Sequence, residues 1–215
     1  MDNDAVVALY RRRALRVAAW LRHVPFVELV GLNGSLATNT ATADSDIDFY
    51  IVTTPGRLYT ARILTIIATH LTGQRRYGTH IAGRICLNRF ATRAGVTVTP
   101  RNEYHARVFS PLVPLFSLPG VYARYRAANE WMAQEHWPVI PLPQWRRDIQ
   151  AIVSTKPIIR RWVEFFLRGR MGDALENRLS AYQRERILRH GATYDPDSRV
   201  FIRAEEICLH IAKHG

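Results

Sequence analysis

Residues 33–53 read NGSLATNTATADSDIDFYIVT, and this stretch decides the fold. A Gly34-Ser35 pair is followed, after ten residues, by Asp46-Ile47-Asp48. The apolar runs 26–32 (FVELVGL) and 47–52 (IDFYIV) both have the pattern of buried strands. Gly34-Ser35 therefore predicts a sharp turn between the two strands, and the small residues over 37–43 predict a short helix or loop after it.

The spacing of Asp46 and Asp48 predicts a metal site. Residues two apart on a strand share one face, so the carboxylates lie together while Ile47 and Phe49 point into the core. Their Cα atoms are expected about 6.6 Å apart. Mg²⁺ takes one or two carboxylates and completes its shell with phosphate and water oxygens, and the cation relieves the repulsion between the acids. We expect Asp46 and Asp48 to be both metal ligands and catalytic residues.

Gly34 and Ser35 are predicted nucleotide-binding residues. Glycine lets the backbone approach a phosphate closely, and a serine at a helix N-terminus offers a hydroxyl beside N–H groups that attract anions. A structural alternative stays open, because Gly-Ser and Asp-x-Asp are each common and residues 45–48 (SDID) also fit a capped turn that enters a strand.

A wider resemblance covers about the first 135 residues, a normal domain size. The stretch 33–53, with PFVELVGLNGS, TPGRLYTARIL, RICLNRF and AANEW, resembles the polymerase β-like nucleotidyltransferases, in particular a poorly characterised prokaryotic branch with a minimal nucleotidyltransferase domain. The resemblance implies a mixed-sheet core, Mg²⁺ or Mn²⁺ as cofactor, and a nucleoside triphosphate such as ATP as substrate. It implies transfer of a nucleoside monophosphate to a hydroxyl and leaves the acceptor open.

The third carboxylate of that family is missing from its expected place. It usually comes from a following strand, which here corresponds to 84–90 (RICLNRF) and contains no acid. Asn88 stands there instead; its amide oxygen can bind a hard cation but cannot act as a general base. Glu103 is the nearest downstream acid, at the start of an expected helix. We therefore expect nucleotide binding with slow transfer, and a catalytically inactive nucleotide- or nucleic-acid-binding protein is the alternative outside enzymes.

A long helix is predicted over 57–72, opened by Pro55-Gly56 and ended by Gly73. Arg57 and Arg62 leave its apolar face, and Arg57 is predicted to reach the triphosphate; the alternative is contact with surface carboxylates. The residues expected to cover the sheet are Ile63, Leu64, Ile66, Ile67 and Leu71.

The strong positive charge favours a polyanionic acceptor. The chain of 215 residues carries a net charge of +12, and 28 of its 30 basic residues are arginines, which bind phosphate in a bidentate manner. RNA is the preferred acceptor class, and a protein hydroxyl, as in antitoxin-like adenylylating enzymes, is the alternative. A cationic small molecule is disfavoured. Two clusters of arginines are predicted to form solvated faces of amphipathic helices whose aromatic residues point into the core. The first consists of Arg11, Arg12, Arg13, Arg16 and Arg22. The second consists of Arg160, Arg161, Arg168 and Arg170, which alternate with Trp162, Phe165 and Phe166.

The predicted fold class is α+β: a small mixed sheet flanked by helices, with an all-helical C-terminal region. The core with its N-terminal helix (4–22) occupies 1–137, and the helical region occupies 138–215 after a proline-rich linker. Residues 110–120 are read as a connector, 96–99 as a further strand, and 200–214 as either strand or helix. Cys86 and Cys208 are read as buried thiols of a cytoplasmic protein without membrane contact.

Overall fold

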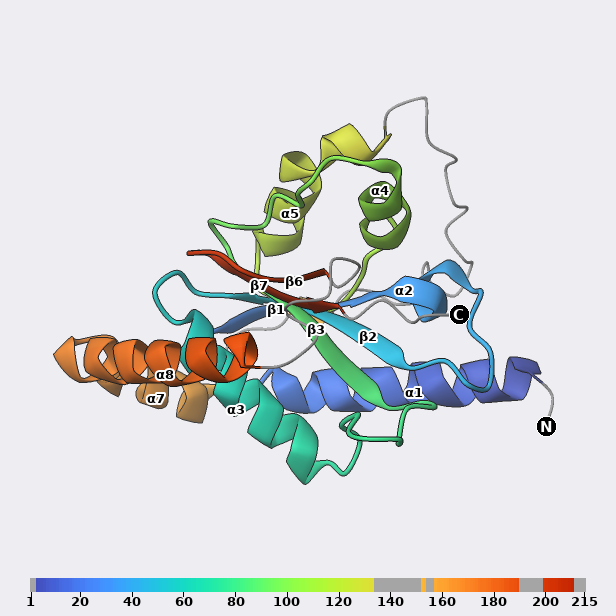
Figure 1. The fold of residues 1–215 in the computed structure, drawn as a ribbon. Coiled ribbons are helices and arrows are strands. Elements are labelled where there is room, and N and C mark those ends of the chain that lie inside the picture. The colour runs from blue at the N-terminus through green and yellow to red at the C-terminus, as the bar shows by residue number, and fades with distance from the viewer. Residues whose placement is uncertain (1–2, 134–151, 154–156, 190–198, 211–215) are drawn as a thin grey trace.

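The computed structural model describes residues 3–133, 152–153, 157–189 and 199–210, and these form helices around one mixed sheet (Figure 1). The sheet has seven strands in the order β5-β4-β1-β2-β3-β7-β6. Its centre consists of β1 (Val27–Asn33), β2 (Ile47–Thr53) and β3 (Ile85–Thr92). The predicted α+β class is confirmed.

The register of the three central strands brings three chain segments to one edge of the sheet. β1 and β2 are antiparallel, and Asn33 lies opposite Asp48. β2 and β3 are parallel, and Asp48 lies opposite Cys86. The register shifts after Phe49, so Asn88 is an extra residue in β3. The end of β1 and the starts of β2 and β3 therefore meet at the same edge.

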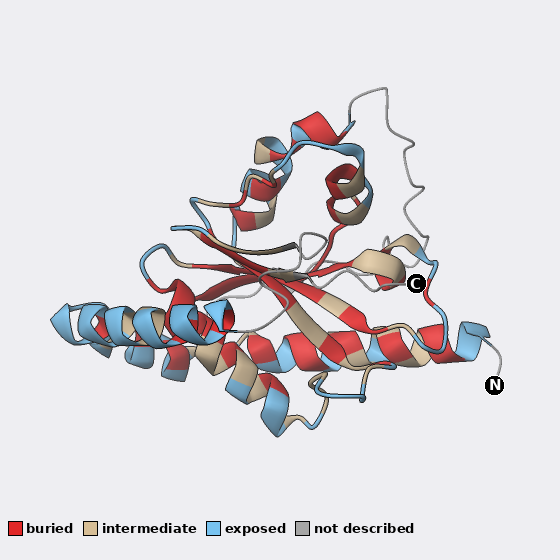
Figure 2. Ribbon diagram, viewed as in Figure 1, coloured by how far each residue is buried: buried red, intermediate tan, exposed pale blue. Residues whose placement is uncertain are grey.

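Helices cover both faces of the sheet. In Figure 1, α1 (Asn3–Leu21), α3 (Leu58–Leu71), α7 (Ile158–Phe166) and α8 (Arg170–Leu188) lie below the strands, and α4 (Glu103–Phe109), α5 (Val121–Ala128) and the 3₁₀ helix η1 (Glu130–Ala133) lie above. Ile47 and Phe49 belong to the core cluster that includes α1, and Tyr50 to the cluster that includes α4 and α5. The strands are accordingly buried along most of their length (Figure 2).

The prediction of a connector over 110–120 is wrong, because this segment contains β4 (Val113–Ser117), which pairs with β1. Pro114 is tolerated because it lies opposite Gly31, next to an irregularity in the β1–β4 register. The predicted strand over 96–99 is also wrong. Val96 and Val98 instead pack as loop residues in the cluster around α4 and α5.

The C-terminal region is helical over α7 and α8, as predicted, but it is not all-helical. It also contributes β5 (Ile152–Val153), β6 (Arg199–Ile202) and β7 (Glu206–His210) to the sheet. β7 pairs with β3, and an ion pair between Arg89 and Glu206 is buried at this junction. The predicted boundary at 137/138 lies outside the described residues and stays a prediction.

The apolar face predicted for the helix over 57–72 is partly wrong. Ile67 and Leu71 are exposed, whereas Arg62 is buried. The reason is α8, which packs on α3: the Arg62 Nη1 atom donates to Gln183 Oε1 at 2.5 Å. A polar partner distant in sequence thus reverses the orientation that periodicity suggested.

α7 has the opposite orientation to the one predicted. Its aromatic residues Trp162, Phe165 and Phe166 are exposed, while Arg160 and Glu164 are buried. Arg160 donates to Glu164 at 2.8 Å and to the carbonyl oxygens of Arg22 and Val27. This buried ion pair anchors the helix, so the core stripe proposed for these aromatic residues is wrong.

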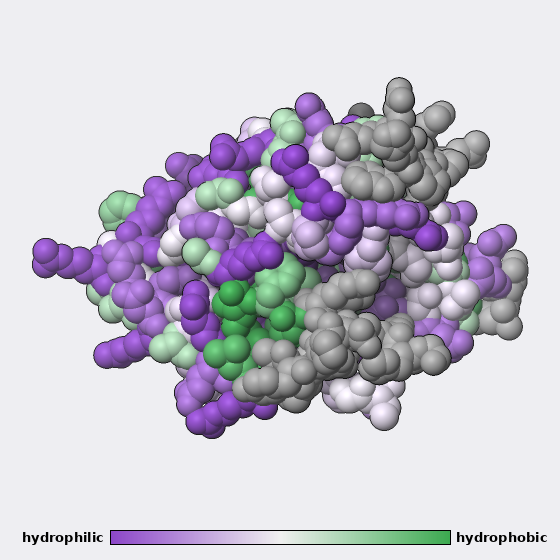
Figure 3. All heavy atoms as spheres, turned by 45° about the horizontal axis from the view of Figure 1, so that its top comes forward, coloured by the Kyte–Doolittle hydropathy of each residue, from purple (hydrophilic) through white to green (hydrophobic). Residues whose placement is uncertain are grey.

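Figure 3 shows one face of the molecule, on which an apolar patch lies beside hydrophilic side chains. Within the described residues, every helix is too short or too polar to cross a membrane.

Candidate active site

The turn after β1 lies in contact with the second acid. Gly34 begins the short helix α2 (Gly34–Thr38) and has a φ of +69°. A Cβ atom built on Gly34 would overlap with Asp48 Oδ2. Both the positive φ and the lack of space therefore require glycine here, and this close approach fixes the acid beside the turn.

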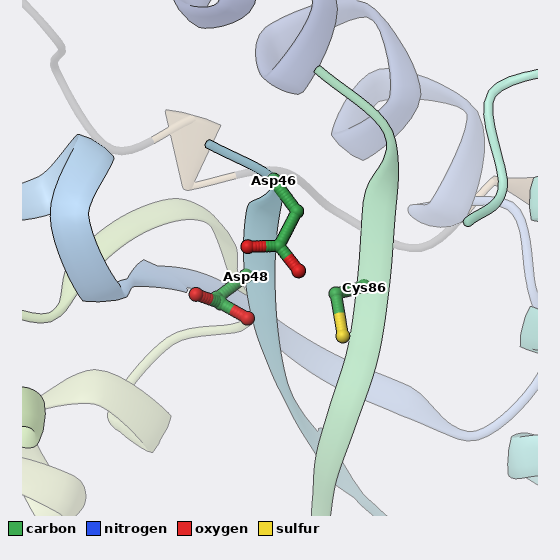
Figure 4. Close-up of side chains that lie close together, drawn as sticks. All are labelled: Asp46, Asp48 and Cys86. Atoms are coloured by element: carbon green, nitrogen blue, oxygen red, sulfur yellow. The ribbon is translucent and has the colours of Figure 1, made fainter. Parts of the chain in front are cut away.

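Asp46, Asp48 and Cys86 form the candidate metal centre (Figure 4). One potential ligand atom from each of them lies within 4.8 Å of the others. Asp46 is buried, and the other two are half-buried. Burial, together with the charges of Asp48 and Asp46, raises the pKa of the Cys86 thiol. The two carboxylates are oxygen ligands that fit a hard cation such as Mg²⁺.

Arg76 and Asn88 orient the two acids. Arg76 Nη1 donates to Asp46 Oδ2 at 2.5 Å, and Asn88 Nδ2 donates to Asp48 Oδ1 at 2.8 Å. Although burial alone would lower the pKa of Arg76, the facing Cys86 and Asp46 raise it. Asn88 Oδ1 is buried without a hydrogen-bond partner among the described groups. An orphaned amide oxygen beside two carboxylates is one more ligand suited to a hard cation.

These residues line a cavity of about 790 Å³, here called the acid-pair cavity. It brings together five of the six residues proposed from the sequence, and four arginines contribute to its wall. The five are Gly34, Ser35, Asp46, Asp48 and Asn88, and the arginines are Arg62, Arg75, Arg76 and Arg89.

Arg57 lies elsewhere, and its predicted contact with the triphosphate is not supported by this geometry. It lines a different cavity of about 710 Å³, here called the Arg57 cavity. Its guanidinium donates to the carbonyl oxygens of Leu167 and Arg168, each at 3.0 Å, and to Asp173 at 2.7 Å. Arg57 follows the C-terminal end of β2, whereas Asp46 precedes its start, and a seven-residue strand separates its ends by about 20 Å.

The sequence reading missed several residues of the site. Cys86 was treated only as a buried thiol, although it stands two residues before Asn88 on the same strand. Arg75 and Arg76 follow α3 in the loop that closes the cavity, and local patterns do not reveal this position. Glu103, the downstream acid, is the first residue of α4, and it is absent from the residues that line the acid-pair cavity.

Comparison with known proteins finds one family that part of this chain is similar to. Residues 17–84 match the nucleotidyltransferase domain family. The matched segment includes Gly34, Ser35, Asp46 and Asp48, but ends before Cys86 and Asn88. Neither the curated proteins nor the solved structures gave a significant match to the chain.

Proposed function

We propose that the protein transfers a nucleoside monophosphate to a hydroxyl of an RNA acceptor. The match of residues 17–84 to the nucleotidyltransferase domain family is the premise of this proposal, and it is consistent with a polymerase β-like enzyme. The donor is a nucleoside triphosphate, such as ATP. One observation carries the proposal: Gly34, Ser35, Asp46 and Asp48 line a single cavity, and Gly34 contacts the second acid.

Different side chains hold the two acids in position for this reaction. Asp46 and Asp48 hold Mg²⁺ or Mn²⁺, which when bound neutralises charge on the transferring phosphate. Arg76 positions Asp46, and the amide of Asn88 positions Asp48. The backbone at Gly34 and the Ser35 hydroxyl bind the polyphosphate of the donor.

Asn88 sets a limit on the rate. The acceptor oxygen forms a bond to the α-phosphorus, the bond to the pyrophosphate oxygen breaks, and the acceptor proton must leave. An amide cannot take this proton, so the proton passes to water or to pyrophosphate. Since a positioned general base contributes about 100-fold or more, we propose a slow enzyme.

RNA is supported by the net charge of +12 and the predominance of arginine. The position of Asn88 favours a second candidate, an inactive protein that binds nucleotide and RNA without transfer, since Asn88 stands beside Asp48 where an acid is expected. Cys86 and Cys208 are thiols rather than halves of a disulfide, which supports a reducing, cytoplasmic setting.

The test uses α-labelled ATP, CTP, GTP and UTP with Mg²⁺ or Mn²⁺, total RNA and a protein extract. We expect label on RNA, lost about 1,000-fold in Asp46→Asn and in Asp48→Asn. The matched control is Asp44→Asn, an equivalent change at an exposed position two residues upstream. Label on protein would support the adenylylating alternative, and RNA retention without label would support the inactive one. Full activity in both Asp46→Asn and Asp48→Asn would refute the proposal.

A further inference from the structure

A smaller cavity of about 270 Å³ adjoins the acid-pair cavity. It is formed by residues of α3, α8, β6 and β7, and by Arg75. Arg62, Ile66, Arg75 and Leu209 line both cavities. The two spaces therefore share a wall, and a ligand in one lies next to the other.

Three arginines line this smaller cavity: Arg62, Arg75 and Arg186, here called the arginine cluster. Arg62 is buried, Arg75 is half-buried and Arg186 is exposed. No aspartate or glutamate is found among the described residues that line the cavity. Arg62 binds Gln183 through one nitrogen, while its Nε atom is buried without a hydrogen-bond partner. The cluster thus presents donors and positive charge with no acid to match them.

The electrostatics of the cluster differ from those of the neighbouring arginine. Burial, followed by the charge of Arg75, lowers the pKa of Arg62 to about 10, and Arg186 adds to this. Burial and Arg186 likewise lower the pKa of Arg75. Arg76, by contrast, faces Asp46 and has a raised pKa. Mutual repulsion within the cluster would be relieved by a bound anion, and phosphate is the anion that guanidinium groups match best.

The position of the cluster distinguishes it from the expected site of the triphosphate. Gly34 follows β1, the acids lie at the start of β2, and Cys86 and Asn88 lie on β3. Val200, which lines the smaller cavity but not the acid-pair cavity, lies on β6 at the far edge of the sheet. In strand order the acids thus separate the Gly-Ser turn from the cluster. In-line transfer requires the attacking oxygen and the leaving group on opposite sides of the transferred phosphorus. If the turn holds the leaving polyphosphate, the cluster lies on the acceptor side.

We propose that the arginine cluster binds a backbone phosphate of the RNA acceptor and so positions the attacking hydroxyl. This inference rests on the proposed function, and it assigns the acceptor subsite of the same centre. The cluster acts through phosphate contact, so it contributes affinity and position without sequence specificity.

The test measures binding rather than transfer, on an Asp48→Asn background in which chemistry is blocked. The probe is a fluorescein-labelled, single-stranded 12-nucleotide RNA followed by anisotropy, and MgATP binding is measured in parallel. Arg75→Gln and Arg186→Gln change half-buried and exposed side chains, so the fold should survive, as a thermal melt would verify. We expect about tenfold weaker RNA binding in the double variant. The slope of log affinity against log salt should fall by about 0.7 per arginine.

The control is the double variant Arg170→Gln and Arg178→Gln, which removes the same two charges from exposed positions on α8. It should leave RNA affinity within about twofold, because isolated surface charges contribute little at physiological salt. RNA affinity equal to this control in the double variant of Arg75 and Arg186 would overturn the inference. An equal loss of MgATP affinity would also overturn it, because the phosphate bound would then be the donor's. Absence of RNA labelling by the unmodified protein, with the binding loss intact, would refute transfer alone.

Discussion

The two large cavities at opposite ends of β2 are both lined by arginines and acids, but they differ in whether these side chains have partners of opposite charge. In the Arg57 cavity, Arg57 binds Asp173, Glu164 binds Arg160, and Arg93 faces Glu28 at 3.4 Å. In the acid-pair cavity, Asn88 Oδ1 and Arg62 Nε are buried without a hydrogen-bond partner among the described groups. Glu28 Oε2 of the Arg57 cavity also has no hydrogen bond there, but it faces the opposite charge of Arg93. Charge and volume alone therefore do not distinguish a binding site from a structural junction; unmatched donors and acceptors do.

The largest effect is expected at the structural end, from Glu164→Ala. The Glu164 carboxylate accepts from the Phe26 backbone N–H and from Arg160 Nε, both at 2.8 Å. Its removal leaves the Arg160 charge buried without its acid, so we expect a loss of about 3–5 kcal/mol in the free energy of unfolding. Urea denaturation measures this, and MgATP affinity of the folded fraction should be unchanged.

Glu185→Ala is the control for that loss. Glu185 forms an exposed ion pair with Arg189 on α8, and such pairs contribute about 0–1 kcal/mol. If the two variants lost the same stability, Glu164 would be an ordinary surface acid and the contrast between the cavities would fail.

At the other end, Gly34→Ala should act on function more than on stability. The added methyl group would displace Asp48 Oδ2, and a misplacement near 1 Å costs about 100-fold in rate. Gly73→Ala provides a close match, because Gly73 has a φ of +66° and open space around it. Both variants should lose about 1 kcal/mol of stability, but only the first should lose nucleotidyl transfer. Equal transfer rates in the two would show that the turn does not support the acid.

Arg57→Met tests whether the two ends of β2 have different roles. Methionine keeps part of the stem packing but leaves the carbonyl oxygens of Leu167 and Arg168 without their donor. We expect about 2 kcal/mol of lost stability and MgATP affinity within about twofold of the unmodified protein. Arg76→Met should lose more MgATP affinity than Arg57→Met, because Arg76 positions Asp46. Isothermal titration calorimetry on both variants measures these affinities. A large loss of MgATP affinity in Arg57→Met would restore the contact predicted from the sequence.

The sequence predicted the part of the site that depends on local rules. Strand alternation places Asp46 and Asp48 together, and the Gly-Ser turn marks the end of the preceding strand. Antiparallel pairing then brings Gly34 beside Asp48. The predicted contact between Arg57 and the triphosphate left the length of β2 out of account. Asp46 precedes this seven-residue strand and Arg57 follows it, so the two lie at opposite ends.

Buried arginines were the other source of error. Arg62 and Arg160 interrupt apolar patterns, so periodicity places them in solvent. Each has partners distant in sequence. Arg62 binds Gln183, 121 residues away, and Arg160, besides its ion pair with Glu164 one turn along the helix, donates to the carbonyl oxygens of Arg22 and Val27, 138 and 133 residues away. A buried charge with such a partner has no local signature, and the apolar residues displaced from the core become exposed in its place.

The smallest predicted effect, a gain, is expected from Asn88→Asp. Asn88 lies in the bulge of β3 and donates to Asp48, so an aspartate there would add a carboxylate beside the acid pair. With divalent metal present, the new acid can accept the acceptor proton, and we expect about tenfold faster transfer, below the usual contribution of an evolved general base. Without metal, three adjacent acids repel one another, so the variant should be less stable in EDTA than in Mg²⁺. Asn177→Asp, an exposed change on α8, should alter neither quantity. If the variant were equally stable in EDTA and in Mg²⁺ and its transfer rate were unchanged, no cation would bind beside residue 88. The acid-pair cavity would then be a structural junction like the Arg57 cavity.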